Sequence, residues 1–366
     1  MKIWLVSAFI AALALPAQAQ AEAEVKVETV AEGLEHPWGL AFLPDGAMLV
    51  TERPGRLRVV RKGVLSEPVA GMPEVSARGQ GGLLDLALDA DFASNRTMFF
   101  SFSEPRPEGG NGTSVARARL SADGSALEDV KVIFRQQPAI QSDAHFGGRI
   151  AFAPDGNLFV TLGERYTMRD SAQDLGTDLG KVIRITKDGA PAPGNPFIGE
   201  EGALPELWSI GHRNAQGAAI EPSTGLLWTV EHGAQGGDEI NRPEAGKNYG
   251  WPVISFGKDY DDSKIGEGTE KEGMEQPLHY WDPSIAPSGM AFYEGAMFPQ
   301  WKGDLLIGAL KGQKLVRLDV EGGRIVGEEA MLTDFGERIR DVRVGPDGAV
   351  YLLTDNPRGR VLRMAK

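Results

Sequence analysis

The chain contains no cysteine. Disulfides, thiolate metal sites and cysteine nucleophiles are therefore excluded. Long apolar runs are almost as scarce, because the clearest one, Ile3 to Leu15, is shorter than the roughly 20 residues that span a bilayer. It follows Lys2 and precedes Ala17-Gln18-Ala19, a pattern typical of a secretory signal. We expect a signal peptide over residues 1–19, a loose tail over residues 20–28, a periplasmic or secreted location and no membrane span.

Basic residues are also in short supply, with 38 Lys and Arg against 51 Asp and Glu and a net charge of -13. Such a charge repels nucleic acids and anionic membrane surfaces and gives no long-range attraction toward either. We therefore expect no nucleic-acid partner, and hard cations or neutral small molecules as ligands. The sequence leaves the oligomeric state open between a monomer and a homodimer.

Helical periodicity is nearly absent, because Gly and Pro interrupt almost every window of useful length. What recurs instead is a turn followed by a strand. The turns are Leu43-Pro44-Asp45-Gly46, Ala153-Pro154-Asp155-Gly156 and Gly345-Pro346-Asp347-Gly348, with a weaker copy over Glu221 to Gly225. Proline presets the first φ angle of such a turn and glycine takes the positive one, so each copy predicts a hairpin.

These hairpins predict an all-β protein, a six-bladed β-propeller of four-stranded antiparallel blades that forms one catalytic domain over residues 29–366. Six blades of ordinary size use up the mature length. A large β-sandwich with similar turns is the alternative, but a unit that recurs from one end of the chain to the other favours radial repetition. We expect Val350 to Leu353 and Val361 to Met364 to close the ring against a strand over Lys26 to Val30.

Several segments depart from the strand rhythm beside glycines, where propeller loops gather at the mouth of the channel. Gln80 lies among glycines that allow a close approach to a ligand, unless this is only an inter-blade loop. His145 suits proton transfer, although a histidine at a strand start is often a structural hydrogen-bonding residue. Arg213 and Asn214 suit a carbonyl or carboxylate ligand, unless Arg213 forms a salt bridge between blades.

A further segment, Glu231 to Asn241, is followed closely by Lys247 to Trp251. Adjacent carboxylates after glycines, with backbone carbonyls nearby, supply the hard oxygen donors that Ca²⁺ prefers, although an acidic surface loop is the alternative. Near the C-terminus stand Lys311, Arg338 and Arg340. Arg338 and Arg340 are two residues apart, so a strand would project both from one face. These cations suggest a multiply anionic ligand, with simple surface placement as the alternative.

Taken together, the segments LEHPWGLAFLPDG, GQGGLLDLALD, HFGGRIAF, LGKVIRI, SIGHRNAQG, EHGAQGGDEIN, GKNYGWP and ERIRDV resemble the soluble quinoprotein sugar dehydrogenases, most closely the periplasmic aldose sugar dehydrogenases. Members of that family are six-bladed propellers that hold pyrroloquinoline quinone (PQQ) and Ca²⁺ at the channel mouth. The resemblance implies oxidation of an aldose at its anomeric carbon to a lactone, by hydride transfer to the quinone. It also implies an electron acceptor that the sequence does not identify.

The same resemblance implies the roles of individual residues. His145 would be the general base, and Arg213 would stabilise the developing oxyanion. The implied cofactor-binding residues are Gln80, Arg213, Asn214, Tyr260, Ala309, Leu310, Lys311, Arg338, Ile339 and Arg340. PQQ carries three carboxylates, which would account for Lys311, Arg338 and Arg340. For Ca²⁺ the resemblance implies the backbone oxygens of Gly233 and Ala234, with Glu239 and the carbonyl of Tyr249 at a second, more structural ion.

The chain departs from the family pattern at two places. Ala144 precedes His145 where some relatives carry an acidic or amide residue, which removes one candidate for orienting the histidine. Asp143 is a candidate substitute, but its side chain would point in a different direction. Ala234 stands where proline is familiar in the family. Two other function classes stay open: a calcium-dependent propeller lactonase, which would not require the three cations, and a propeller that binds carbohydrate or protein without chemistry.

Overall fold

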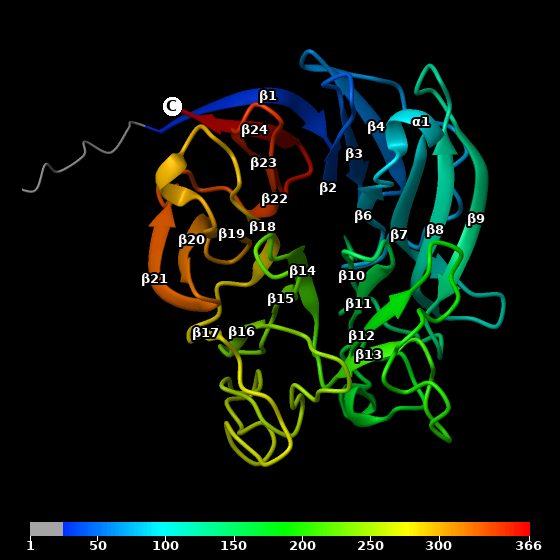
Figure 1. The fold of residues 1–366 in the computed structure, drawn as a ribbon, viewed down its shortest axis with the longest axis vertical. Helices are drawn as coiled ribbons and strands as arrows, with labels where there is room; N and C mark the ends of the chain where they lie inside the picture. Colours follow the sequence, from blue (N-terminus) through cyan, green and yellow to red (C-terminus); the bar gives the residue numbers. More distant parts are fainter. Residues whose placement is uncertain (1–24) are drawn as a thin grey trace, which may run out of the picture.

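The computed structural model describes residues 25–366, so the predicted signal peptide and the first part of the predicted tail lie outside the described residues. The described part contains 24 strands in six sheets of four, which confirms the predicted six-bladed propeller (Figure 1). The short helical segments among the strands are α1 (Phe92–Asn95), η1 (Arg169–Gln173) and η2 (Pro299–Trp301). Within residues 25–366, no helix is long and apolar enough to cross a membrane.

Blades 1 to 5 are each built from four consecutive strands. Blade 1 contains β2 (Pro37–Phe42), β3 (Met48–Glu52), β4 (Arg56–Arg61) and β5 (Val64–Leu65). Blade 2 contains β6 (Leu83–Leu88), β7 (Thr97–Pro105), β8 (Asn111–Leu120) and β9 (Leu127–Arg135). Blade 3 contains β10 (Gly147–Phe152), β11 (Leu158–Leu162), β12 (Lys181–Ile185) and β13 (Leu207–Ile210). Blade 4 contains β14 (Ala215–Ile220), β15 (Leu227–Glu231), β16 (Asp238–Asn241) and β17 (His279–Trp281). Blade 5 contains β18 (Pro287–Phe292), β19 (Leu305–Ala309), β20 (Lys314–Glu321) and β21 (Arg324–Met331).

Blade 6 joins the two ends of the chain. It contains β22 (Ile339–Val344), β23 (Val350–Thr354), β24 (Gly359–Ala365) and, as its outermost strand, β1 (Lys26–Leu34). β1 runs antiparallel to β24, with Lys26 opposite Ala365. The expected ring closure is therefore present. The strand begins inside the segment expected to be a tail, since Lys26 is already paired.

The proline–glycine turns join the first and second strands of blades 1, 3, 4 and 6, as expected for hairpins. In blade 1, Gly46 has a φ of 83° and its N–H donates to the carbonyl of Leu43 at 2.9 Å. A positive φ is unfavourable for residues with a Cβ, so glycine is the residue that fits this turn. In these four blades the local sequence thus determines where the innermost strand ends.

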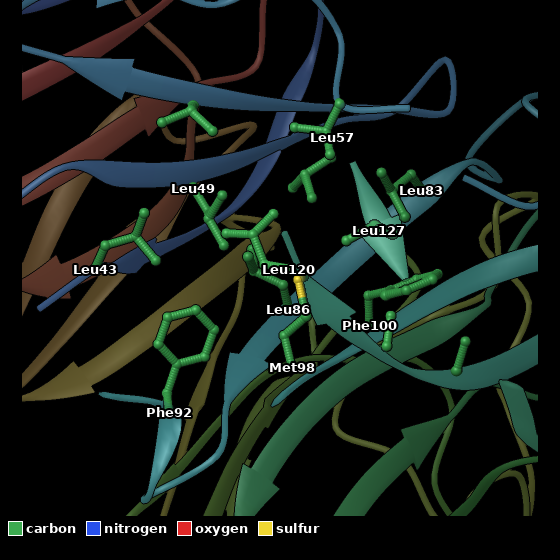
Figure 2. Packing of buried hydrophobic residues seen from close by; sticks show 14 of the residues in the cluster. Leu43, Leu49, Leu57, Leu83, Leu86, Phe92, Met98, Phe100, Leu120 and Leu127 are labelled. Atoms are coloured by element: carbon green, nitrogen blue, oxygen red, sulfur yellow. The ribbon is translucent and has the colours of Figure 1, made fainter. Parts of the chain in front are cut away.

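The core lies between the blades. One buried cluster combines Leu49 and Leu57 of blade 1 with Leu86, Phe100 and Leu120 of blade 2 (Figure 2). Burial of such side chains contributes about 1.5–3 kcal/mol each. Because each blade covers the apolar face of the next, the ring holds the loops at its two ends in fixed positions.

Charged side chains fill the centre of the ring. Nη1 of the fully buried Arg149 lies 3.1 Å from Oδ1 of Asp85 and 2.9 Å from Oδ1 of Asp341. The guanidinium of Arg149 also lies 4.1 Å from the ring of Trp38. On β18, a Cβ added to Gly289 would come within 2.1 Å of Asp341 Oδ1. The absence of a side chain there makes room for this ion network, which forms the floor beneath the channel mouth.

Candidate active site

The predicted site residues come together because the innermost strands of all six blades start at the same end of the ring. β2, β6, β10, β14, β18 and β22 pack side by side around the centre. Gln80 precedes β6, His145 precedes β10, Arg213 and Asn214 precede β14, and Arg338 precedes β22. Residues far apart in the sequence therefore share the loops at one channel mouth.

His145 is a buried histidine held on one side by a carboxylate. Its Nδ1 lies 2.8 Å from Oε1 of Glu164, and its backbone N–H donates to Oε1 of Gln80 at 2.9 Å. β10 and β11 are antiparallel, with Gly147 opposite Leu162. His145, two residues before Gly147, therefore comes to face Glu164, two residues after Leu162. Burial lowers the pKa of His145 below its usual range, while the hydrogen bond to Glu164 acts to raise it. A ring held at Nδ1 has Nε2 available to accept a proton.

The expectation that Asp143 might orient His145 is wrong. The Asp143 side chain is 44% exposed and lies 3.4 Å from Nη2 of Arg78. Glu164 makes the contact instead, and its side chain is only 1% exposed. Sequence reasoning missed Glu164 because it is 19 residues from His145, and only the strand register brings the two together.

The segment around Glu164 has an unusual backbone. His145, Arg165 and Tyr166 all have positive φ angles, of 50°, 65° and 65°. Such conformations cost of order 1–3 kcal/mol each in residues with a Cβ and tend to occur at functional sites. A Cβ on Gly163 would lie 2.1 Å from the carbonyl oxygen of His145, so glycine allows the two segments to pack closely.

Arg213 and Asn214 form the next part of the mouth, and both are buried. Nη1 of Arg213 donates to the carbonyls of His232 at 3.1 Å and Gly233 at 2.6 Å, and its Nη2 donates to the Tyr260 hydroxyl at 3.2 Å. The alternative of a salt bridge between blades is not observed for Arg213 within residues 25–366.

Several donors at this mouth are buried without a partner among the described residues. They are Nε of Arg213, Nδ2 of Asn214, Nε of Arg340 and Nε1 of Trp251. Buried N–H groups normally have acceptors, and an unsatisfied one costs about 1–3 kcal/mol. A ligand rich in oxygen acceptors would satisfy them.

The three predicted cations have different surroundings. Lys311 is exposed, Arg338 is 44% exposed at its side chain, and Arg340 is buried. Both arginines lie 3.1 Å from Oδ2 of Asp355, so they do project from one face as expected. Asp355 has a pKa lowered well below its usual range, because Arg340 and then His36 and Arg338 oppose the effect of its burial. This carboxylate, which sequence reasoning missed, offsets one of the two positive charges of Arg338 and Arg340.

Three of the residues implied to bind the cofactor have side chains in the core. Ala309, Leu310 and Ile339 are buried, and Ala309 and Ile339 belong to hydrophobic clusters. The carbonyl of Ile339 accepts a hydrogen bond from the Ser288 hydroxyl at 2.6 Å. Any contact of these residues with a ligand would therefore be made by backbone atoms or by the edge of a side chain.

Three of the four residues implied to hold calcium line one small cavity. Gly233, Glu239 and Tyr249 line it together with Arg213 and Trp251. Ala234 is buried and packs against Trp251. Within residues 25–366, no three acidic or histidine side chains gather into a metal site. An ion in this cavity would have to combine the Glu239 carboxylate with backbone carbonyls, the donor set that the family resemblance implies.

The Glu239 carboxylate accepts one hydrogen bond among the described residues, from Nδ2 of Asn241 at 3.2 Å, which leaves it able to bind a further ligand. Burial, together with the nearby negative charges of Glu231 and Asp238, raises the pKa of Glu239 to about 8. Asp238 itself accepts hydrogen bonds from the backbone N–H groups of Gly233, Ile285 and Ala286. The carboxyl groups of Glu231, Asp238 and Glu239 thus lie close enough together to disfavour the ionisation of Glu239, and a bound cation would offset this repulsion.

Two other histidines lie near the mouth. Nε2 of His232 donates to the carbonyl of Pro287 at 2.6 Å, and burial lowers the pKa of His232 to about 3. His212 is fully buried, with Nδ1 at 2.9 Å from Glu231 and Nε2 at 2.9 Å from Ser209. Both ring nitrogens of His212 are occupied, so His145 is the histidine best placed to act as a base.

A model of the glucose / sorbosone dehydrogenase family matches residues 34–363. The chain belongs to this family. It is 48% identical over 343 residues to aldose sugar dehydrogenase YliI of Escherichia coli K12, covering 93% of this chain and 92% of that protein. Dehydrogenases are oxidoreductases, so the protein is an oxidoreductase.

Solved structures agree with the family assignment. The apo-form crystal structure of soluble aldose sugar dehydrogenase from Escherichia coli superposes with a TM-score of 0.91 at 48% identity, covering 93% of this chain and 99% of that one. The PQQ-bound form of aldose sugar dehydrogenase from Streptomyces coelicolor superposes with a TM-score of 0.77 at 32% identity, covering 94% of this chain and 99% of that one.

Proposed function

We propose that the protein oxidises aldose sugars at the anomeric carbon to lactones, with PQQ as the bound hydride acceptor, Ca²⁺ as a second cofactor and His145 as the general base. The observation that carries the proposal is the arrangement at the channel mouth. A carboxylate-held histidine and buried, unpartnered N–H donors occupy the same mouth as two arginines that share a single carboxylate.

The donors at the mouth suit PQQ. The quinone supplies a two-electron acceptor when it is bound, and its three carboxylates and carbonyl oxygens are acceptors that match the unpartnered N–H groups of Arg213, Asn214 and Arg340. Lys311 and Arg338 would add charge-assisted hydrogen bonds. Gln80 is exposed beside His145 and keeps its amide N–H₂ for a ligand, because its Oε1 is used by the His145 backbone.

His145 can take the proton from the anomeric hydroxyl while hydride leaves the same carbon. Glu164 holds Nδ1, which directs Nε2 toward the site and favours the protonated ring after transfer. The guanidinium of Arg213 is available to stabilise negative charge that develops on the acceptor oxygen. These roles place acid–base and electrostatic catalysis on two neighbouring loops of blades 3 and 4.

For calcium, the residues fit through oxygen donors. The carbonyl of Gly233 already accepts from Arg213 and has a second lone pair, and Glu239 has a raised pKa that a nearby cation would bring down. We propose one ion at the carbonyls of Gly233 and Ala234, and a second at Glu239 and the carbonyl of Tyr249. When bound near the quinone, Ca²⁺ would supply Lewis-acid polarisation.

The decisive experiment is reconstitution. Purified apoprotein would receive PQQ and Ca²⁺ separately and together, and dye-linked glucose oxidation would be measured beside His145→Ala. We expect activity only with both additions, and a loss of about 10²–10⁴-fold in the variant. No oxidation across a panel of aldoses, with no PQQ binding, would favour the calcium-dependent lactonase or the non-enzymatic binding propeller.

A cofactor-binding variant separates these function classes further. Arg338→Ala should weaken PQQ binding by about 10-fold or more, since a charge-assisted hydrogen bond contributes about 1.5–3 kcal/mol. Arg324→Ala is the matched control, because Arg324 is an exposed arginine on the outermost strand of blade 5. A lactone hydrolase would tolerate both changes equally.

We also propose that the protein is exported, on the strength of Lys2, the apolar run and the Ala17-Gln18-Ala19 pattern. N-terminal sequencing of the protein recovered from its native host tests this. A mature terminus near Gln20 supports export, whereas a terminus at Met1 would contradict it.

A further inference from the structure

We propose that Tyr166 is a specificity-determining residue that forms one wall of the subsite for the sugar ring, an inference that rests on the aldose oxidation proposed above. The starting observation is its position. The Tyr166 ring lies 5.3 Å from the His145 ring, centroid to centroid, and nearly perpendicular to it at 86°. Tyr260, which contacts Arg213 through its hydroxyl, lies 6.4 Å beyond Tyr166.

The backbone conformation indicates that the position of Tyr166 is fixed by the surrounding structure. Arg165 and Tyr166 both have a φ of 65°, a left-handed conformation that residues with a Cβ rarely adopt. Strained residues of this kind persist only where their surroundings fix them. We therefore attribute the position of Tyr166 beside the base to the residues around it.

Arg165 anchors the turn that carries Tyr166. Its side chain is fully buried and its guanidinium lies 3.9 Å from the Phe146 ring. It donates to the carbonyls of Ala144 and Asn111, each at 3.0 Å. These anchors tie the turn to the same segment that carries His145, so the distance between Tyr166 and the base is fixed by side chains that do not face the site.

The side chains of three successive residues in this segment point to different surroundings. Glu164 contacts the ring of His145, Arg165 is buried, and Tyr166 is 47% exposed. A tyrosine retained only for packing would be covered. Tyr260, the other aromatic ring at this mouth, is 54% exposed.

Exposed aromatic rings beside a base suit a pyranose ligand. Tyrosine has an apolar face and a polar edge, so it packs against the C–H groups of a sugar ring while its hydroxyl stays hydrated or bonds to a sugar hydroxyl. A ring that stands perpendicular to His145 would bound the sugar laterally and leave Nε2 open to the anomeric hydroxyl. Tyr166 would thereby select the sugar's shape without taking part in proton transfer.

The test compares Tyr166→Phe, Tyr166→Leu and Tyr166→Ala in the PQQ- and Ca²⁺-loaded protein. We expect KM for glucose to rise about 5- to 10-fold in the alanine variant, less in leucine and little in phenylalanine, with kcat within about threefold of wild type. Leu226→Ala is the matched control, since Leu226 is 40% exposed in a turn at the opposite end of blade 4.

A second readout does not depend on turnover. 1,5-Anhydroglucitol lacks the anomeric hydroxyl and cannot be oxidised at that carbon, so its binding to the loaded protein can be followed by calorimetry. Its dissociation constant should rise in Tyr166→Ala by the same factor as KM, while PQQ affinity stays unchanged. If the alanine variant does not fold, the leucine variant decides.

The outcomes separate the inference from the function on which it rests. A wild-type protein that oxidises no aldose overturns the proposed function. Active wild type with unchanged KM and unchanged 1,5-anhydroglucitol binding in Tyr166→Ala and Tyr166→Leu overturns the role of Tyr166 alone. A fall in kcat with KM unchanged would instead mean that Tyr166 positions His145, which would also overturn the sugar contact.

Discussion

The contact between His145 and Glu164 yields the sharpest prediction. Glu164→Gln keeps the size of the side chain and removes its negative charge. The hydrogen bond to His145 is 2.8 Å long, and the Glu164 side chain is 1% exposed. A hydrogen bond to a charged partner contributes about 1.5–3 kcal/mol. Since about 1.36 kcal/mol corresponds to a tenfold change in rate, we expect kcat to fall about 10- to 150-fold.

The pH profile gives an independent check on the same variant. His145 must be neutral to accept a proton, and burial holds its folded-state pKa below 6.5. The rate should therefore be constant near neutrality and fall as the pH drops through that lowered pKa. Glu164 acts to raise the pKa of His145. Its replacement should move the acid limb to lower pH while lowering the plateau.

The assay is dye-linked glucose oxidation by the loaded protein between pH 4 and 9, with PQQ affinity measured in parallel. Asp143→Asn is the control, because Asp143 lies closer to His145 in sequence but its side chain is exposed and faces Arg78. That variant should stay within about threefold of wild type. A Glu164→Gln protein with an unchanged plateau and an unshifted acid limb would refute the reasoning.

Two further perturbations test the floor and the metal region. Arg149→Met should lower the free energy of unfolding by about 3 kcal/mol, at the lower end of the range for a broken buried ion pair, because Arg343 still contacts both Asp85 and Asp341. Urea unfolding measures this loss, and a value below about 1 kcal/mol would contradict the prediction. Glu239→Gln should reduce the rise in Tm that Ca²⁺ produces in the wild type, whereas Glu244→Gln, at an exposed carboxylate, should not. An equal Ca²⁺-dependent rise in both variants would exclude Glu239 as a ligand.

The repeated turns made the fold readable from sequence. Each proline–glycine turn forms for a local chemical reason, and the distance in sequence between successive turns indicates the length of a blade. The pairing of β1 with β24 was expected only from the general habit of propellers to close the ring with strands from both ends of the chain. The start of β1 at Lys26 was harder to predict, because a charged outer strand resembles a tail.

The site was only partly predictable. His145 and Arg213 precede innermost strands beside glycines, which is a local signal. Glu164 and Asp355 have no such signal, because their roles depend on register and on which blades are neighbours. One clue to Glu164 was present: His212 and Glu231 are also 19 residues apart and make the same Nδ1 contact in the next blade. Tyr166 could not have been found at all, since its position depends on a strained backbone held by Arg165.

Ring closure in blade 6 has a consequence for how the protein is made. Every residue assigned to catalysis or to a cofactor lies before position 341, yet the partner of β1 spans Gly359–Ala365. A nascent chain therefore holds the complete set of reactive groups before it can assemble the mouth that unites them. A chain that lacked Gly359–Ala365 would leave β1 without its partner strand, so we expect it to carry the candidate site residues without a closed ring.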